Sequence, residues 1–381
     1  MDSIGPRLLE IDVPPGKSAF LWGPRRVGKT WWLRHRFRAE DVRYIDLLET
    51  DTFAELASRP ALLRERHDGR LTIIDEVQKL PALLDEVHGL IEHRGASFVL
   101  TGSSARKLRR GHANLLGGRA WRYEMGPLSS REIPRFDLDR ALRAGLLPSH
   151  YLSEAPERDL RAYVADYLKE EIAAEAIVRN IPAFADFLRA AALTNAELLN
   201  YTNIAGECGV SAKVVRGYFE ILEDTLLGAR LPAWRRVQKR RLLLADKFYF
   251  FDVGVAGHLA RRHPVPGSSD YGKAFEHYLL TEILNYRRYR SPDLDVAYWR
   301  TAGGLEVDFV LGDLEVAVEC KSGARVHDGD LRGLRALGEE HAVRHRLLVS
   351  GEKEPRRTSD GIEILPWGDF LDRLWGGVLG V

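Results

Sequence analysis

One stretch near the start of the chain has the residue types and spacing to bind a polyphosphate. The pattern G-x-x-x-x-G-K-[ST] is fitted by Gly23, Pro24, Arg25, Arg26, Val27, Gly28, Lys29 and Thr30. Its glycines let backbone N–H groups wrap a polyphosphate at the positive end of the helix that follows. We expect Lys29 to reach the β- and γ-phosphates of a nucleotide, and the Thr30 hydroxyl to hold Mg²⁺. The alternative, a glycine turn with a surface lysine, is disfavoured by a second motif.

The second motif is a pair of carboxylates, Asp75 and Glu76, that directly follows the apolar run Leu71–Ile74. Open α/β sheets bind ligands at the carboxyl ends of their strands, which is where these two side chains should lie. We expect Asp75 to contact Mg²⁺, directly or through water, and Glu76 to polarise the attacking water as general base. An Asp-Glu pair by itself would be read as the start of a loop. Together with the phosphate loop, the pair predicts hydrolysis of a nucleoside triphosphate.

Two further positions are candidates for the same site. A polar cluster follows the predicted strand Ser97–Leu100, and in it Ser103 or Ser104 could bond the γ-phosphate or the water, although a polar turn fits equally well. The transition state also needs added positive charge, which a neighbouring subunit often supplies through an arginine. Arg119 is the first candidate for that role and Arg106 the second; both also fit the pattern of ordinary surface arginines.

Residues 195–227 resemble a winged helix. Thr202–Cys208 is expected to form a short helix and Ser211 to cap the next one, which turns Lys213 and Arg216 toward DNA. A wing that grips the phosphate backbone would then carry Arg235, Arg236, Lys239, Arg240 and Arg241. A solvated basic hairpin in a purely structural winged helix remains the alternative. The acidic end of the second helix, with Glu220, Glu223 and Asp224, puts sequence-specific reading in doubt.

The last part of the chain carries a pattern typical of metal-assisted phosphodiester hydrolysis. Period two puts Glu319 and Lys321 on one face of a predicted strand, and Asp308 on the partner strand completes a carboxylate pair for Mg²⁺. Lys321 would position or deprotonate a water, and Glu276 on the preceding helix is a possible fourth member. Exposed strand faces also carry alternating charges, so a purely structural role stays open.

These residues need elements that bring them together. In the first third, short apolar runs at 19–22, 44–47, 71–74 and 97–100 alternate with amphipathic stretches, and 121–125 could add a fifth strand, which predicts a parallel sheet covered on both faces. Helices dominate from about residue 138 to 225, and strands at 306–311 and 315–320 follow a long helix. The predicted domains are residues 1–135, 136–263 and 270–381, an α/β phosphate-binding domain, a helical and winged-helix domain, and a nuclease-like α/β domain.

Composition limits the class of protein. The 381 residues are 45% hydrophobic and 29% charged, which excludes a disordered or fibrous chain. The net charge is +1, so a nucleic-acid surface must come from local clustering. The two cysteines are too few for a disulfide framework, and neither a signal peptide nor a membrane-spanning run is seen, so we expect a soluble cytoplasmic protein.

Taken together, the motifs make the chain similar to a family of prokaryotic AAA-type ATPases. That family has an N-terminal P-loop domain, a helical and winged-helix middle, and a C-terminal domain of unknown function with a PD-(D/E)xK restriction-endonuclease-like fold. The resemblance rests on residues 23–30, 73–76, 100–104, 118–119, 247–252, 275–276, 298–300, 306–308 and 319–321. It implies ATP as the nucleotide, a ring-shaped homo-oligomer such as a hexamer, and an Arg119-type finger acting between subunits.

Two hypotheses of different classes follow. The first is an ATP-driven machine that translocates or remodels DNA, such as branched junctions, with metal-dependent cleavage as an extension of it. The second is an ATP-operated switch or scaffold that regulates a protein partner and carries an inert nuclease-like domain. DNA-stimulated ATP hydrolysis separates them.

Overall fold

The computed structural model describes residues 4–103, 116–168, 180–235 and 245–381, and the chain divides into two compact units. Unit 1 comprises Met1–Leu128 and the short segment Ile221–Leu227, whereas unit 2 comprises Ser129–Glu220 and Gly228–Val381. The third predicted domain and most of the second fall in unit 2, whereas Ile221–Leu227 of the second falls in unit 1. The boundary between those two domains therefore stays a prediction.

A five-stranded sheet forms the centre of unit 1, and every pair of neighbouring strands in it is parallel. Its order is β2-β3-β4-β1-β5, with bounds Val42–Asp46, Leu71–Asp75, Phe98–Gly102, Ser18–Trp22 and Ala120–Glu124. The prediction of a parallel α/β sheet is confirmed, including its fifth strand. Because the strands are parallel, the residues that follow β1, β3 and β4 all emerge at one edge of the sheet.

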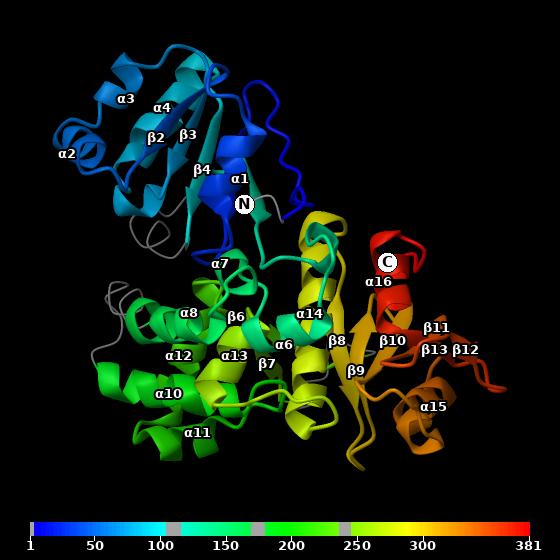
Figure 1. Cartoon of the computed structure of the whole chain (residues 1–381). Helices are drawn as coiled ribbons and strands as arrows, with labels where there is room; N and C mark the ends of the chain where they lie inside the picture. Colours follow the sequence, from blue (N-terminus) through cyan, green and yellow to red (C-terminus); the bar gives the residue numbers. More distant parts are fainter. Residues whose placement is uncertain (1–3, 104–115, 169–179, 236–244) are drawn as a thin grey trace. The chain divides into compact units, whose positions relative to one another are not determined.

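Helices accompany the sheet of unit 1, as Figure 1 shows for α1 to α4. Their bounds are Lys29–Arg36, Thr50–Ser58, Leu62–Glu65 and Leu83–Arg94. Alternate residues of the strands point to one core, in which Phe20 and Leu100 lie with Leu84 and Val87 of α4. The intervening residues, such as Leu21, are also fully buried. Burial on both faces explains why these strands are continuous apolar runs.

The first part of unit 2 is helical. Its helices are α6 Leu138–Ala144, α7 Pro148–Tyr151, α8 Pro156–Ala162, the π-helix Tyr163–Leu168, α10 Ile181–Leu193, α11 Tyr201–Cys208, α12 Ala212–Asp224 and α13 Val253–Ala260. Between α11 and α12 the chain turns at Gly209, whose φ of 63° favours glycine. The strands β6 Gly228–Leu231 and β7 Lys247–Phe250 then pair antiparallel. A helix-turn-helix followed by two strands is thus present.

The second part of unit 2 is a six-stranded mixed sheet in the order β12-β13-β11-β10-β9-β8. Its strands are β8 Val296–Arg300, β9 Glu306–Leu311, β10 Val316–Lys321, β11 His345–Ser350, β12 Arg356–Arg357 and β13 Glu363–Pro366. The helix α14, Ser269–Tyr289, contacts β10, and α15 Arg332–Glu340 and α16 Trp367–Trp375 complete this part (Figure 1). Strand β9 pairs antiparallel with β10, which pairs parallel with β11.

Short helical turns are also present at Val77–Lys79, Ser130–Glu132 and Asp328–Leu331. Across the residues that the structure describes, no helix is both long enough and apolar enough to cross a bilayer.

Candidate functional site

The phosphate loop joins β1, next to the edge strand of the sheet, to the helix α1. Gly23 has no room for a side chain, because a Cβ there would lie 2.5 Å from the carbonyl oxygen of Met125. Gly28 precedes α1 with φ 96°, a conformation that favours glycine. The side chains of Arg25 and Arg26 are exposed, whereas those of Pro24 and Val27 are buried. The local geometry thus explains both glycines of the motif.

Lys29 lies inside this loop. Its side chain is 6% exposed, and its ammonium group donates hydrogen bonds to the carbonyl oxygens of Gly23 (2.6 Å) and Pro24 (3.0 Å). The lysine therefore turns back over the loop to which it belongs. A phosphate oxygen entering the loop would compete with these carbonyls for the ammonium protons, and it would form the stronger, charge-assisted bond.

Asp75 is the centre of the second cluster and is fully buried. Its Oδ2 accepts hydrogen bonds from the Thr30 hydroxyl (2.6 Å) and from the Tyr44 hydroxyl (2.6 Å). Burial, followed by the charge of Asp75, raises the pKa of Tyr44 above its ordinary value. A hydroxyl oxygen and a carboxylate oxygen this close together are hard ligands of the kind that Mg²⁺ prefers. Thr30 and Asp75 therefore fit that ion.

Glu76 takes part in a buried chain of polar side chains. The amide nitrogen of Gln78 donates to Glu76 Oε2 (2.5 Å) and to the Ser103 hydroxyl (3.2 Å), which links the ends of β3 and β4. An ionised carboxylate only accepts hydrogen bonds, so the amide must present its NH₂ group to Glu76. Gly102 lies against this amide, because a Cβ there would be 2.2 Å from Gln78 Oε1. These hydrogen-bonded side chains hold the carboxylate of Glu76 in place.

Gln78 and Tyr44 are two members of this site that the sequence did not indicate. Gln78 is 5% exposed and its Oε1 has no hydrogen-bond partner within the described residues. The available signal was its position two residues after Glu76. Tyr44 lies on β2, whose register pairs Asp46 with Asp75, and only knowledge of that neighbouring strand could have indicated its role.

Arg119 lies beside the amino-terminal ends of the strands, whereas the phosphate loop lies at their carboxyl ends. Its carbonyl accepts from the N–H of Ser18 (3.1 Å), the first residue of β1, whereas the phosphate loop follows the last residue of β1, Trp22. The guanidinium group pairs with Glu92. Arg119 therefore does not belong to the phosphate site of its own chain. Ser104 and Arg106 lie outside the described residues.

The candidate DNA-binding residues are only partly described. Lys213 and Arg216 are exposed on α12, and the Arg216 guanidinium lies 5.0 Å from the centre of the Tyr201 ring. Arg235 follows β6 and is partly buried. The remainder of the predicted wing, Arg236, Lys239, Arg240 and Arg241, falls outside the part of the chain that the structure covers. On the opposite face of α12, Val215 and Phe219 are fully buried.

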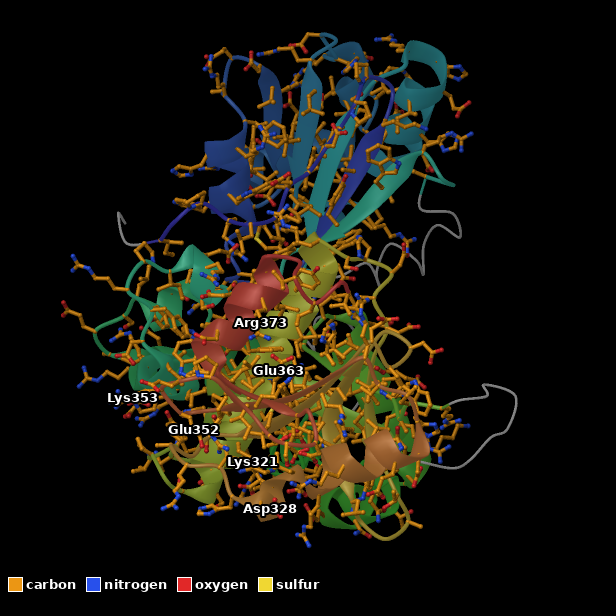
Figure 2. The ribbon with its side chains drawn as sticks, turned by 90° about the vertical axis from the view of Figure 1, so that its right-hand side faces the viewer. Lys321, Asp328, Glu352, Lys353, Glu363 and Arg373 are labelled. Carbon is orange, nitrogen blue, oxygen red and sulfur yellow. The ribbon has the colours of Figure 1, made fainter. Side chains whose placement is uncertain are left out.

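The nuclease-like residues come together on β9, β10 and α14. Asp308 Oδ2 accepts from the backbone N–H of Cys320 (2.8 Å), and Glu319 Oε1 accepts from the Lys321 ammonium (2.6 Å). Glu319 Oε2 is buried and, among the described residues, has no hydrogen-bond partner. Lys321 ends β10, where Figure 2 labels it. The predicted group of carboxylates and lysine thus forms one cluster around the pairing of β9 with β10.

A second lysine, Lys247 of β7, enters this cluster and was missed by the sequence analysis. Its side chain is almost fully buried, and its ammonium pairs with Glu306 and, at 3.5 Å, with Glu276. The Tyr249 hydroxyl donates to Glu276 Oε1 (2.6 Å). Glu276 is therefore engaged by two groups of β7. The run Lys247–Asp252 is part of the family resemblance, but its sequence gave no indication of this contact.

The carboxyl groups of the cluster are hard to ionise. Burial, followed by the charge of Asp308, raises the pKa of Glu276 to about 7 and that of Glu319 to about 8. Burial alone would lower the pKa of Lys247, but the carboxylates around it, that of Glu276 first, outweigh burial and raise it. The carboxylates around Lys321 raise its pKa in the same way, so both lysines of the cluster are firmly charged.

The cluster offers two carboxylates to a metal ion. No group of three or more His, Cys, Asp or Glu side chains is arranged to hold one in the described ranges. Asp308 and Glu319 nevertheless fit Mg²⁺, since that ion commonly binds one or two carboxylates together with water and phosphate oxygens. The unpartnered Glu319 Oε2 is an available ligand atom. Glu276 is already engaged, so the structure gives no support to a third carboxylate ligand.

Comparisons with known proteins divide the chain into three matched segments. Residues 16–134 match the family model of an AAA domain, residues 135–265 match a domain of unknown function (DUF8612), and residues 271–370 match another (DUF4143). The comparison with curated proteins gives no match. The N-terminal unit, with its parallel sheet and phosphate loop, is a P-loop AAA-type ATPase domain.

Three solved structures show remote similarity. The Walker-type ATPase PABY2304 of Pyrococcus abyssi is 15% identical, with a TM-score of 0.44 over 64% of this chain and 90% of that one. The ORC1 protein of Aeropyrum pernix in complex with DNA is 15% identical, with a TM-score of 0.26 over 64% and 86%. A STAND protein of Pyrococcus horikoshii with a tetratricopeptide repeat sensor is 13% identical, with a TM-score of 0.19 over 72% and 44%. The assignment of unit 1 rests on the AAA domain match and on its own geometry.

Proposed function

We propose that this chain is an ATP-hydrolysing, oligomeric ATPase that acts on DNA. The observation that carries the proposal is the contact chain at the ends of β3 and β4, in which Thr30 bonds Asp75, and Gln78 joins Glu76 to Ser103. These groups adjoin a phosphate loop that is complete in sequence. Such an arrangement suits a triphosphate better than any other ligand.

In the proposed reaction the loop from Gly23 to Thr30 binds the phosphates of ATP through its N–H groups, and Lys29 exchanges its two carbonyl partners for phosphate oxygens. Thr30 and Asp75 would hold Mg²⁺, which neutralises charge on the β- and γ-phosphates when it is bound. Glu76 accepts a proton from the water whose oxygen bonds to the γ-phosphorus. The bond from that phosphorus to the bridging oxygen breaks, which leaves ADP and inorganic phosphate.

The buried amide of Gln78 supports the roles of Glu76 and Ser103. By donating to both, it keeps the general base and the hydroxyl at a fixed separation, so that water and γ-phosphate are presented to groups that are already oriented. Ser103 would donate its hydroxyl proton to a γ-phosphate oxygen. Gln78 acts through Glu76 and is therefore a positioning residue.

Assembly into a ring is the part of the proposal that concerns Arg119. Since this residue lies at the edge of the sheet opposite its own phosphate loop, it could act only on the nucleotide of a second copy. An arginine supplied in this way stabilises the charge of the transition state. The AAA domain match supports an oligomer of this type, and we propose a hexamer.

Contact with DNA is supported by exposed cations. Lys213 and Arg216 lie near the start of α12, the second helix of a helix-turn-helix, and the segment after Arg235 adds further basic residues in sequence. Contacts of this kind hold the phosphate backbone without reading sequence. Cleavage by Asp308, Glu319 and Lys321 would extend the activity to a nuclease.

The test is the rate of ATP hydrolysis with and without duplex or four-way junction DNA. We expect DNA to raise the rate severalfold, and Lys29→Ala to abolish both the basal and the stimulated rate. Incubating the same DNA with Mg²⁺ or Mn²⁺ tests cleavage, which must disappear in Asp308→Ala if these residues are its active site. An unchanged ATPase rate in DNA would contradict the DNA part of the proposal while leaving the ATPase part intact.

One observation favours a second function, an ATP-operated switch or scaffold that controls a protein partner. Lys247 and Tyr249 engage Glu276, which ties the cluster of unit 2 to β7 in the manner of a structural junction. On this account ATP binding changes the oligomeric state and DNA is neither bound nor cleaved. ATP-dependent oligomerisation without DNA binding at low salt would support it.

A further inference from the structure

Unit 2 contains a cleft of about 300 Å³ that no part of the proposed function uses. It is lined by residues of α6, α8, α13 and the segment that follows α13. Figure 1 labels these three helices. These three helices contact one another. The charged side chains that line the cleft are Arg143, Glu157, Arg161, Arg261 and Arg262, accompanied by His258 and His263. Four arginines thus face one glutamate.

Two of the arginines have no side-chain partner among the residues that the structure describes. Arg262 bonds the carbonyl oxygen of Leu193 and pairs with Asp270 at 3.6 Å, and Arg143 bonds the carbonyl oxygen of Asp139 at 3.3 Å. By contrast, Arg161 and Arg261 make no hydrogen bond through their guanidinium groups and no ion pair within the described ranges. Both are exposed at the rim of the cleft, so their cations are open to a ligand.

Helix ends explain part of this arrangement but not all of it. Arg143 lies in the last turn of α6, Arg161 in the last turn of α8, and Arg261 directly after α13. Cations are favoured at these positions because the carboxyl end of a helix is negative. This preference at helix ends does not require the three side chains to share a cleft, because it would act equally on three separate surfaces. Their meeting around one cleft concentrates like charge, which an anion would relieve.

The chemistry of the cleft identifies the anion. Guanidinium groups bind phosphate oxygens through paired N–H donors, more strongly than they bind neutral groups. Val265, which is exposed, adds apolar surface on which a sugar or a base can rest. Burial, and then the charge of Arg161, lowers the pKa of His258, which favours the neutral ring, and a neutral imidazole can donate or accept a hydrogen bond.

We propose that this cleft binds the phosphate group of a nucleotide, carried either by a free nucleotide or by a nucleic-acid strand. A volume near 300 Å³ suits a single nucleotide, at the lower end of the range for small-molecule pockets. The site uses neither the phosphate loop of unit 1 nor the cations of α12. It therefore stands whether or not the chain hydrolyses ATP.

The test uses the full chain with Lys29→Ala in every variant, which weakens nucleotide binding at the phosphate loop. One arm titrates adenosine 5′-monophosphate by calorimetry, and the other titrates a fluorescein-labelled 12-nucleotide single strand by anisotropy at several salt concentrations. The cleft variant is Arg161→Ala with Arg261→Ala. Its matched control is Arg344→Ala with Arg357→Ala, which removes the same charge from two exposed arginines elsewhere in unit 2.

We expect Kd for the titrated nucleotide or strand to be about tenfold or more higher in the cleft variant than in the parent, and within twofold of the parent in the control pair. The lysine pair Arg161→Lys with Arg261→Lys should recover part of the lost affinity. Loss in both arms identifies a phosphate site open to free nucleotides, and loss in the strand arm alone identifies a strand phosphate. In that arm the slope of log K against log salt should become less negative by about 1 to 1.5. Equal binding by the cleft variant and the control pair in both arms overturns the proposal. A circular dichroism melt shows that each variant is folded.

Discussion

At the scale of single residues, the account depends on how firmly Glu76 is held. Its carboxylate accepts from Gln78, and the same amide reaches Ser103 at the end of the neighbouring strand. Gln78 and Ser103 are both buried, as is Glu76 itself, so the contact is shielded from bulk solvent. The positioning of the general base is therefore the residue-scale property to test.

We expect Gln78→Leu to lower kcat for ATP hydrolysis about tenfold or more with little change in KM, because it releases the general base but leaves the phosphate loop untouched. The adjacent variant Lys79→Ala is the control, since the Lys79 side chain is exposed and its ammonium lies 5.3 Å from the centre of the Phe53 ring. Steady-state kinetics give both constants. A rise in KM with unchanged kcat would show that Gln78 serves binding instead.

The sequence was informative about residues whose roles depend on their own motif. Lys29, Thr30, Asp75 and Glu76 were predicted as one group, and the hydrogen bond between Thr30 and Asp75 brings the two motifs into contact. Gln78 and Lys247 were not predicted, because their roles depend on side chains that meet only after the strands pair. Lys247, for example, reaches Glu276 and Glu306 across 29 and 59 positions of sequence.

At the scale of elements, the junction of β7 with α14 is a buried polar contact that should respond to pH. His277 of α14 bonds the carbonyl oxygen of Phe250 (2.6 Å) and the Asn195 amide (3.2 Å). Burial lowers the pKa of His277 to about 4, below the ordinary 6.5. The ring is therefore neutral in the folded protein, and one nitrogen donates while the other accepts.

A histidine with a lowered pKa makes stability depend on pH in one direction. The folded state binds fewer protons than the unfolded state between pH 6.5 and 4, so the contribution is fully present above pH 6.5 and is lost as the pH falls toward 4. The loss should reach about 3 kcal/mol. We expect the difference between the free energies of unfolding of wild type and His277→Gln to decrease by this amount as the pH falls from 6.5 to 4. Urea titrations at each pH measure both free energies. A difference that does not vary with pH contradicts the assignment.

The parallel sheet of unit 1 could be predicted because its strands are buried on both faces and read as short apolar runs separated by amphipathic stretches. The sheet of unit 2 could be predicted only in two neighbouring strands, β9 and β10. Its order combines antiparallel pairing of β9 with β10 and parallel pairing of β10 with β11. Such pairings are set by long-range packing, which residue periodicity does not encode.

At the scale of the whole molecule, the proposal requires subunits to complete one another's sites. A copy with Lys29→Ala lacks a working phosphate loop but keeps Arg119, whereas a copy with Arg119→Ala has the reverse defect. We expect each variant to be inactive alone, and a mixture of the two to recover a measurable fraction of the wild-type ATPase rate. Restored hydrolysis would arise where an intact loop faces an intact arginine.

A mixture of Lys29→Ala with Glu76→Gln serves as the control, since both defects lie in the same site and no arrangement of subunits repairs it. Mass photometry with a non-hydrolysable ATP analogue reports the subunit number in parallel. A mixture with Arg119→Ala that shows only the sum of the separate rates would exclude a role for Arg119 between subunits, without bearing on the phosphate loop itself.

The most direct test of the central claim is the release of inorganic phosphate from ATP in the presence of Mg²⁺, measured together with nucleotide binding. The account predicts multiple turnovers by the wild-type chain. It also predicts a Glu76→Gln variant that binds ATP as tightly as wild type but releases phosphate about 100-fold more slowly. A wild-type chain that neither binds ATP nor releases phosphate, or a Glu76→Gln variant with undiminished turnover, would contradict it.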